Sequence, residues 1–260
     1  MLVGVNPLRE LPKPLVLPNA WDPPSAAAIQ AAGAKAIATT SGGVAWSRGV
    51  PDGGGLTRTL ALEALRRIVR AVTVPVTADI EGGYGDTPEE VAWTVAEVAS
   101  IGALGVNIED SAAGRLLDVS AQADRLAAAR QAGDLVINAR TDTFLMGSGD
   151  VDETLARAQR YAAAGADVLF VPGVVDPAVI KVLVDGPLPL NVMAHPGAPS
   201  VAELAALGVA RISVGTGIAQ AAYGVAAAAA RELLTAGTYE SMAEGLSYGE
   251  LNNMVGRAAG

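Results

Sequence analysis

Two carboxylates stand two residues apart at the end of the apolar run that begins at Val74. Asp79 and Glu81 point to one side of an expected strand end, and the glycines that follow let the backbone turn tightly. Mg²⁺ prefers oxygen ligands and keeps several waters, so a few carboxylates from neighbouring loops can hold it. The alternative is an acidic turn ahead of a helix that begins near Asp86. The stretch alone is consistent with a cation site or with a helix cap.

Further polar residues follow other short apolar runs, each of which we expect to be a strand. They are Asp52, Glu109, Arg140 and His195, the only histidine of the chain. If the runs are neighbouring parallel strands of a barrel, these residues meet at the carboxyl ends of the strands. Carboxylates gathered in one place repel one another unless a cation lies among them. The set as a whole therefore favours a cation site.

The arginine at the end of one run, Arg140, has two interpretations. Its planar guanidinium suits bidentate binding of a substrate carboxylate. It could equally form an ion pair with Asp142 or Glu109. The sequence does not choose between these two roles.

Three more features near the expected strand ends also have a chemical and a structural interpretation. Ser41-Gly42-Gly43 could offer N–H groups and a hydroxyl to an anionic oxygen, or it could be a flexible turn. His195 could be a general base or a substrate contact, or neither. Trp21 could form a wall of the pocket or pack in the core.

A repeated unit must position these residues: an Ala-rich helix, a glycine, a short β-branched strand and a polar turn. Glycine just past a helix adopts the left-handed cap conformation without steric cost. The step recurs at Gly33, Gly102, Gly133, Gly165 and Gly208. The strands are almost wholly apolar, as expected when both faces of a parallel sheet are covered.

Eight strands and eight helices can be placed in the 260 residues, which is the arithmetic of an α/β (β/α)₈ TIM barrel. A doubly wound sheet is the alternative, but its Gly-x-Gly-x-x-Gly turn after the first strand is absent. The strands are expected at 15–18, 36–40, 75–80, 105–109, 135–140, 168–172, 190–193 and 211–214. The helices are expected near 23–33, 57–72, 88–102, 119–132, 151–164, 176–184, 200–207 and 217–236.

Composition excludes several classes of protein. A formal charge of −9 argues against a nucleic-acid partner, which requires a basic surface. Without cysteine there is no disulfide, thiolate ligand or cysteine nucleophile. No signal peptide is predicted, and charged residues or prolines interrupt each apolar stretch before it reaches membrane-spanning length. We expect a soluble cytoplasmic protein.

The motifs that contain these residues resemble the isocitrate lyase and phosphoenolpyruvate mutase superfamily, from Leu17 through Gly215. The most specific are Thr40-Ser-Gly-Gly with Gly49-Val-Pro-Asp52, Asp79-x-Glu81-x-Gly-Tyr-Gly, Gly105-Val-Asn-Ile-Glu109-Asp and Asn138-Ala-Arg140-Thr-Asp. The resemblance implies a Mg²⁺-dependent enzyme, with Mn²⁺ as the alternative ion. Such an enzyme cleaves a C–C bond in a small 2-oxo or 2-hydroxy dicarboxylic acid, oxaloacetate-like or methylisocitrate-like, through a pyruvate enolate.

The resemblance also assigns roles to individual residues. Asp79 matches the direct metal ligand, and Glu81, Glu109 and Asp52 match the carboxylates around it, which act mostly through water. Substrate is expected to be held by Arg140, together with Trp21, Ser41, Gly42, Gly43 and Asp52. The catalytic groups are expected to be Arg140, Glu109, Arg115 and His195.

Departures from the family patterns leave alternatives open. The loop at 111–118 lacks the Lys-Lys/Arg-Cys-Gly motif of isocitrate and methylisocitrate lyases, and Arg115 is its only cation, which we expect to close over the substrate. The loop lysine and asparagine of the mutases and their histidine after strand six are also missing, and Pro172 stands there. The alternatives are a phosphonopyruvate hydrolase or phosphoenolpyruvate mutase, with P–C bond chemistry, and a non-catalytic 2-oxo acid binding protein.

The chain is expected to divide into a catalytic barrel, residues 1–237, and an amphipathic helical tail, residues 238–260. The family exchanges its last helix between paired barrels, which implies that the tail packs on a partner subunit in a homodimer or homotetramer. The partners are then a small 2-oxo or 2-hydroxy acid and further copies of the chain, without nucleic acid or membrane.

Overall fold

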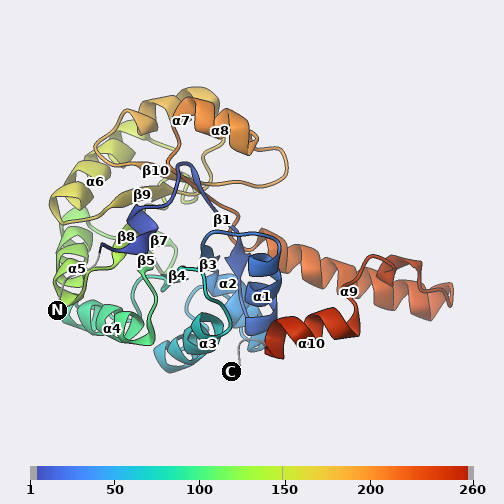
Figure 1. The fold of residues 1–260 in the computed structure, drawn as a ribbon. Coiled ribbons are helices and arrows are strands. Elements are labelled where there is room, and N and C mark those ends of the chain that lie inside the picture. Colours follow the sequence, from blue (N-terminus) through green and yellow to red (C-terminus); the bar gives the residue numbers. More distant parts are fainter. Residues whose placement is uncertain (1–4, 148, 257–260) are drawn as a thin grey trace.

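Parallel strands form a barrel surrounded by helices in the structure, a computed structural model that describes residues 5–147 and 149–256 (Figure 1). The strands are hydrogen-bonded in the order β1-β11-β10-β9-β8-β5-β4-β3-β2. Their bounds are β1 (Leu15–Leu17), β2 (Asn19–Ala20), β3 (Ile37–Thr39), β4 (Val76–Asp79), β5 (Gly105–Glu109), β8 (Val136–Arg140), β9 (Val168–Val171), β10 (Leu190–Met193) and β11 (Arg211–Ser213).

The first strand closes the barrel because it is split in two. β1 pairs with β11, while β2, which begins just after Pro18, pairs with β3. The stretch from Leu15 to Ala20 thus joins the first and last strands of the sheet, and all eight predicted strands are present. The predicted α/β (β/α)₈ barrel is confirmed.

Eight helices lie close to their predicted ranges. They are α1 (Pro23–Ala31), α3 (Arg58–Arg70), α4 (Pro88–Ile101), α5 (Val119–Ala132), α6 (Val151–Ala163), α7 (Pro177–Val184), α8 (Val201–Leu207) and α9 (Gly217–Thr235). At the start of α4, Thr87 and Glu90 form a capping box around Pro88. The acidic stretch at 86–90 therefore does cap a helix, while Asp79 and Glu81 lie before it.

The predicted left-handed glycines are found after four helices. Gly33, Gly102, Gly165 and Gly208 have φ between 93° and 99°. The prediction is wrong for Gly133, whose φ of 173° is ordinary extended backbone. The helix α5 runs to Ala132, and Gly133 leaves it as extended backbone, which any residue can adopt.

Three short elements were not expected from the sequence. Ser41-Gly42-Gly43 is the start of a helix, α2 (Ser41–Ser47), and not the predicted turn. The loop after β5 contains a hairpin of β6 (Ser111–Ala112) and β7 (Arg115–Leu116), with Ala113 and Gly114 in left-handed conformations between them. A 3₁₀ turn, η1 (Pro7–Arg9), covers the amino end of the barrel.

Residues of each strand alternate between two packed regions. Side chains such as Val106 and Ile108 of β5 belong to the large cluster between the barrel and the helices. Inside the barrel, at its amino end, a smaller apolar cluster contains Leu8, Leu17, Ala36, Ala38 and Val136. The opposite, carboxyl end of the barrel is left for polar side chains.

The last helices leave the barrel. α9 extends away from it, η2 (Glu240–Met242) follows, and the chain returns so that α10 (Tyr248–Gly256) contacts α1 (Figure 1). Many apolar side chains here are exposed, among them Val225, Leu233, Leu234, Tyr239, Met242, Leu246, Tyr248 and Leu251. The predicted exchange between subunits stays a prediction, and residues 257–260 of the predicted tail lie outside the described part. No helix within 5–147 and 149–256 is long and apolar enough to cross a membrane.

Candidate active site

A chamber of about 610 Å³ opens at the carboxyl end of the barrel. It is lined by residues that follow β3, β4, β5 and β8 and by the β6–β7 hairpin. The predicted site residues that line it are Ser41, Asp52, Glu81, Glu109 and Arg140, and Asp142 joins them. The strand ends thus bring together most of the polar residues singled out in the sequence.

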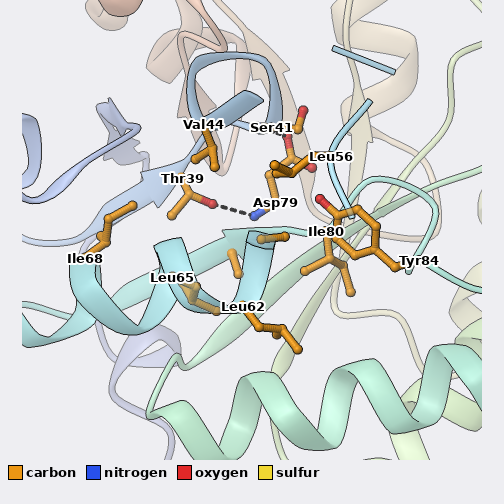
Figure 2. A pocket seen from close by; sticks show the side chains of 12 residues that line it. Thr39, Ser41, Val44, Leu56, Leu62, Leu65, Ile68, Asp79, Ile80 and Tyr84 are labelled. Atoms are coloured by element: carbon orange, nitrogen blue, oxygen red, sulfur yellow. Dashed lines mark hydrogen bonds between the residues drawn. The ribbon is translucent and has the colours of Figure 1, made fainter. Parts of the chain in front are cut away.

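Asp79 lies in the wall beside this chamber, next to a cavity of about 20 Å³ that also contacts Ser41 and Tyr84 (Figure 2). Its backbone N–H donates to the Thr39 hydroxyl at 2.8 Å. Its carboxylate accepts the backbone N–H groups of Ser41, at 3.3 Å, and Glu81, at 3.2 Å. Burial raises the pKa of Asp79, and the charge of Arg140 opposes that rise.

The turn after Asp79 holds Glu81 in place. Glu81 and Tyr84 both have positive φ, 50° and 53°, which few residues other than glycine adopt. The Tyr84 hydroxyl donates to Glu81 at 3.1 Å, and the Gly54 N–H donates to it at 3.0 Å. Burial raises the pKa of Glu81, and the charges of Asp79 and Asp52 add to the rise. Glu81 is therefore held close enough to Asp79 and Asp52 for their charges to act on it.

Arg140 is held by two carboxylates. Its Nη1 lies 2.9 Å from Glu109, and its Nε and Nη2 donate to the two oxygens of Asp142 at 2.6 and 3.1 Å. Burial alone would lower the pKa of Arg140, but the carboxylates of Glu109, Asp142 and Asp79 raise it. The ion-pair role left open by the sequence is therefore present, and it fixes the guanidinium at the wall of the chamber.

Asp142 connects Arg140 to the hairpin. The Ser111 hydroxyl donates to Asp142 at 2.5 Å, and the Asp142 N–H donates to Asp110. Asp110 in turn accepts the Tyr161 hydroxyl at 2.7 Å. Sequence reasoning missed Ser111, and the only available signal was its place directly after the strand-end carboxylates.

Close packing explains the two glycines of α2. A Cβ on Gly42 would lie 2.9 Å from a carboxylate oxygen of Asp52, and one on Gly43 would lie 2.7 Å from the Cβ of Trp21. Gly42 thus lets the Asp52 carboxylate approach the start of α2. Trp21 packs behind this helix and does not line the chamber.

Two of the predicted catalytic residues are not brought into the chamber. Arg115 is exposed on β7, and His195 is exposed in the loop after β10, with its Nδ1 2.9 Å from the carbonyl oxygen of Pro196. Neither lines the chamber in this conformation. Their catalytic roles stay predictions.

The carboxylates fit a hydrated divalent cation. All the candidate donors are oxygens, and Asp79, Glu81 and Asp52 are close enough for their charges to act on one another. Within residues 5–147 and 149–256, no three His, Cys, Asp or Glu side chains approach closely enough to hold a metal ion by themselves. Mg²⁺ retains several waters, so one direct ligand with others acting through water suits this arrangement.

Comparison with known proteins gives consistent results. Residues 6–234 match a family model described as phosphoenolpyruvate phosphomutase. An uncharacterised protein of Mycobacterium tuberculosis is 41% identical over 241 residues, which cover 92% of this chain and 90% of that protein.

Two solved structures of known enzymes share the fold. The first, 2,3-dimethylmalate lyase, is described as a member of the PEP mutase/isocitrate lyase superfamily. It is 30% identical, with a TM-score of 0.82, over 96% of this chain and 92% of that one. The second, a phosphonopyruvate hydrolase solved with oxalate and Mg²⁺, is 26% identical, also with a TM-score of 0.82, over 94% of this chain and 91% of that one.

Proposed function

Because the chain belongs to the phosphoenolpyruvate phosphomutase family, within the isocitrate lyase/PEP mutase superfamily, we propose that it is a Mg²⁺-dependent lyase. Its substrate would be a small 2-oxo or 2-hydroxy dicarboxylic acid, and the bond cleaved a C–C bond at C3, where the electron pair left behind can be delocalised as an enolate. The observation that carries this proposal is the position of Asp79, Glu109 and Arg140 at the ends of the adjacent strands β4, β5 and β8.

The chain's own residues divide the work between metal and substrate. Asp79 would hold the cation directly, with Glu81, Glu109 and Asp52 around it through water. Arg140 would bind the carboxylate of the substrate, because its guanidinium is already fixed by Asp142 and presents N–H groups beside Glu109. Bound Mg²⁺ would act as a Lewis acid that stabilises the negative charge developing on the enolate oxygen.

The start of α2 would contribute to the same charge. The Ser41 N–H now donates to Asp79 at the long distance of 3.3 Å, so a substrate oxygen can compete for it. Gly42 leaves the backbone open to close approach, as its contact with Asp52 shows. These groups would orient the carboxylate and C2 oxygen of the substrate.

C–C cleavage is favoured over P–C chemistry by the residues that this chain lacks. Val171 ends β9 and Pro172 follows it, where the resemblance leads one to expect the histidine of the mutases. A cation suited to a transferring phosphoryl group is also absent from the chamber-lining part of the hairpin, which contributes Ser111, Ala112, Ala113 and Gly114. P–C bond cleavage is the second outcome that the assay must test.

The test is product release from oxaloacetate, 2-methylisocitrate, 2,3-dimethylmalate, isocitrate and phosphonopyruvate, with Mg²⁺ and with EDTA. Pyruvate is the product to follow, except for isocitrate, from which glyoxylate is expected. We expect metal-dependent turnover of at least one C–C substrate. Asp79→Asn should abolish it, and Asp124→Asn, on the exposed side of α5, should not.

Release from phosphonopyruvate alone would replace the lyase with P–C chemistry. If no product were released from any of these substrates, a binding protein would be the alternative. Calorimetry with the same acids would test it. Binding of a 2-oxo acid without turnover would then contradict the proposed lyase activity.

A further inference from the structure

The middle of the barrel interior is polar. Five inward-facing residues on five strands form what we call the inner layer: Thr77, Asn107, Asn138, Asn191 and Arg211, none more than 5% exposed. The apolar cluster around Leu8 and Leu17 lies on its amino side. Asp79, two residues beyond Thr77 on β4, lies on its carboxyl side. The inner layer therefore separates the apolar end of the barrel from the candidate active site.

Protein groups satisfy only part of this layer. The Asn107 side-chain oxygen accepts from Asn138, at 2.7 Å, and from Nη2 of Arg211, at 3.1 Å. Among the described residues, Thr77 Oγ1, Asn138 Oδ1, Arg211 Nε and both polar side-chain atoms of Asn191 are buried without a partner. Buried polar atoms are costly when unpaired, and ordered water is the usual partner that remains.

Arg211 adds an uncompensated charge. No carboxylate within the described ranges lies at ion-pair distance from its guanidinium, which is protonated at neutral pH. Burial lowers the pKa of Arg211 to about 9, and the one charge that opposes this is the Asp79 carboxylate. An isolated buried cation is strongly unfavourable, so a nearby negative charge is required.

The strand register places Asp79 next to this charge. Arg211 donates to Asn107, and Asn107 is the Cα partner of Asp79 across β4 and β5. Both residues face the inside of the barrel. The guanidinium is therefore one side chain away from Asp79, on the side opposite to the chamber. Arg140 acts on the same carboxylate from the chamber side.

We propose that Arg211 is a positioning residue for Asp79, whose negative charge it balances from inside the barrel. This inference rests on the proposed cation site at Asp79, not on the identity of the substrate. Arg140 would supply the matching charge from the chamber until cation and substrate are bound, and Arg211 would supply a permanent one. Asp79 could then keep a fixed orientation at the strand end in the unliganded protein.

The test is a double-mutant cycle on the full-length metal-free protein, read as the urea dependence of unfolding at pH 8. Asp79→Asn is measured in the Arg211 protein and in the Arg211→Gln and Arg211→Lys proteins. Glutamine can still donate to Asn107 but carries no charge, whereas lysine keeps the charge and changes the geometry. We expect Asp79→Asn to be more destabilising with Arg211 than with glutamine, by about tenfold in the unfolding equilibrium constant.

Lysine should behave like arginine in this cycle, because the charge is what couples the two positions. A role limited to packing and hydrogen bonding predicts a different result. The Arg211→Gln protein would be about as stable as the wild type, and Asp79→Asn would have the same effect on stability in all three proteins. That result would overturn the proposal. If the glutamine protein does not fold, a loss of the Asp79→Asn effect in the lysine protein would overturn it equally.

A matched pair provides the control. Asp52 is an exposed carboxylate at the rim of the chamber, so Asp52→Asn and Arg211→Gln should be additive. Absence of turnover on every substrate would contradict the proposed lyase and leave the coupling of Arg211 and Asp79 unchanged. Additive effects of the Arg211 and Asp79 substitutions would contradict the role of Arg211 and leave the lyase proposal intact.

Discussion

Arg140 and Glu109 form an ion pair across two adjacent strand ends, with Nη1 of Arg140 2.9 Å from a carboxylate oxygen of Glu109. The arginine favours the charged form of the carboxylate. Burial nevertheless dominates and raises the pKa of Glu109 to about 8, and the charges of Asp79 and Asp142 act in the same direction. The pair is thus embedded in a site whose negative charge exceeds its positive charge when no metal is bound.

The excess of negative charge in the site predicts how the stability of the metal-free protein depends on pH. A carboxyl group whose pKa is higher in the folded than in the unfolded state stabilises the fold at low pH, and this contribution is lost as pH rises through the folded value. For Glu109 the window runs from 4.5 to about 8. Glu109→Gln should flatten the fall in unfolding free energy across that window, by roughly 1 kcal/mol or more.

Urea unfolding in EDTA at several pH values measures this effect. Glu89→Gln, at an exposed position of α4, is the matched control and should follow the wild type. Parallel curves for the wild type and Glu109→Gln would contradict a raised pKa for Glu109.

Metal binding should stabilise the protein through Asp79. A ligand present at one hundred times its dissociation constant stabilises the folded state by about 2.7 kcal/mol, which for a chain of this size raises Tm by roughly 5–10 °C. We expect Mg²⁺ to produce such a shift in the wild type and little shift in Asp79→Asn. Differential scanning calorimetry with increasing Mg²⁺ measures it, and equal shifts in both proteins would place the cation elsewhere.

The Ser111 hydroxyl ties the β6–β7 hairpin to Asp142, and its removal should loosen the hairpin selectively. A hydrogen bond to a charged group contributes about 1.5–3 kcal/mol, yet this one is local to the hairpin. Ser111→Ala should speed hydrogen exchange of residues 111–117, with a much smaller change in global stability. Ser120→Ala, at the start of α5, is the control, and unchanged exchange in Ser111→Ala would show that the bond does not restrain the hairpin.

Arg115 is exposed on β7 and makes no ion pair among the described residues. If the hairpin closes over the substrate, Arg115 gains a charged partner only in the closed state. Arg115→Ala should then lower kcat/KM by about tenfold or more without changing thermal stability. Arg66→Ala, on the helix α3, is the control and should leave kcat/KM unchanged. If Arg115→Ala also left kcat/KM unchanged, the predicted closure would be excluded.

The exposed apolar side chains after residue 217 predict a homo-oligomer. Leu234 is 83% exposed near the end of α9, and an apolar surface of this extent usually meets another protein. Leu234→Glu should shift the protein from dimer or tetramer towards monomer in sedimentation equilibrium. A wild type that sediments as a monomer would contradict the prediction, whatever the variant does.

The sequence was sufficient for the barrel because its signals are local. Apolar runs of strand length, Ala-rich helices and capping residues such as Thr87 act within a few positions of the chain, and the strands occur where those signals place them. Gly133 shows the limit of this approach. A glycine after a helix permits the left-handed conformation but does not require it, and Gly133 is extended although it stands as far from the next strand as Gly102 does.

The site was only partly predictable, since contacts between strands are not local. Asp79, Glu109 and Arg140 could be placed at strand ends. The bidentate ion pair between Asp142 and Arg140, however, depends on distances between side chains, which the spacing of residues in the sequence does not determine. Ser41 was expected in a turn because the two glycines that follow it have a low helix propensity, although the helix α2 begins there. Arg211 gave no signal either: one arginine in a short strand looks like an exposed edge residue until the barrel closes around it.

The split first strand has a consequence for folding. β2 can pair with β3 as soon as both have been synthesised, but β1 must wait for β11, nearly two hundred positions later. Until then the sheet has two bare edges, which are templates for association with other chains. Contacts between positions so far apart also slow folding. A chain interrupted before Ser213 would therefore be an open sheet prone to aggregation.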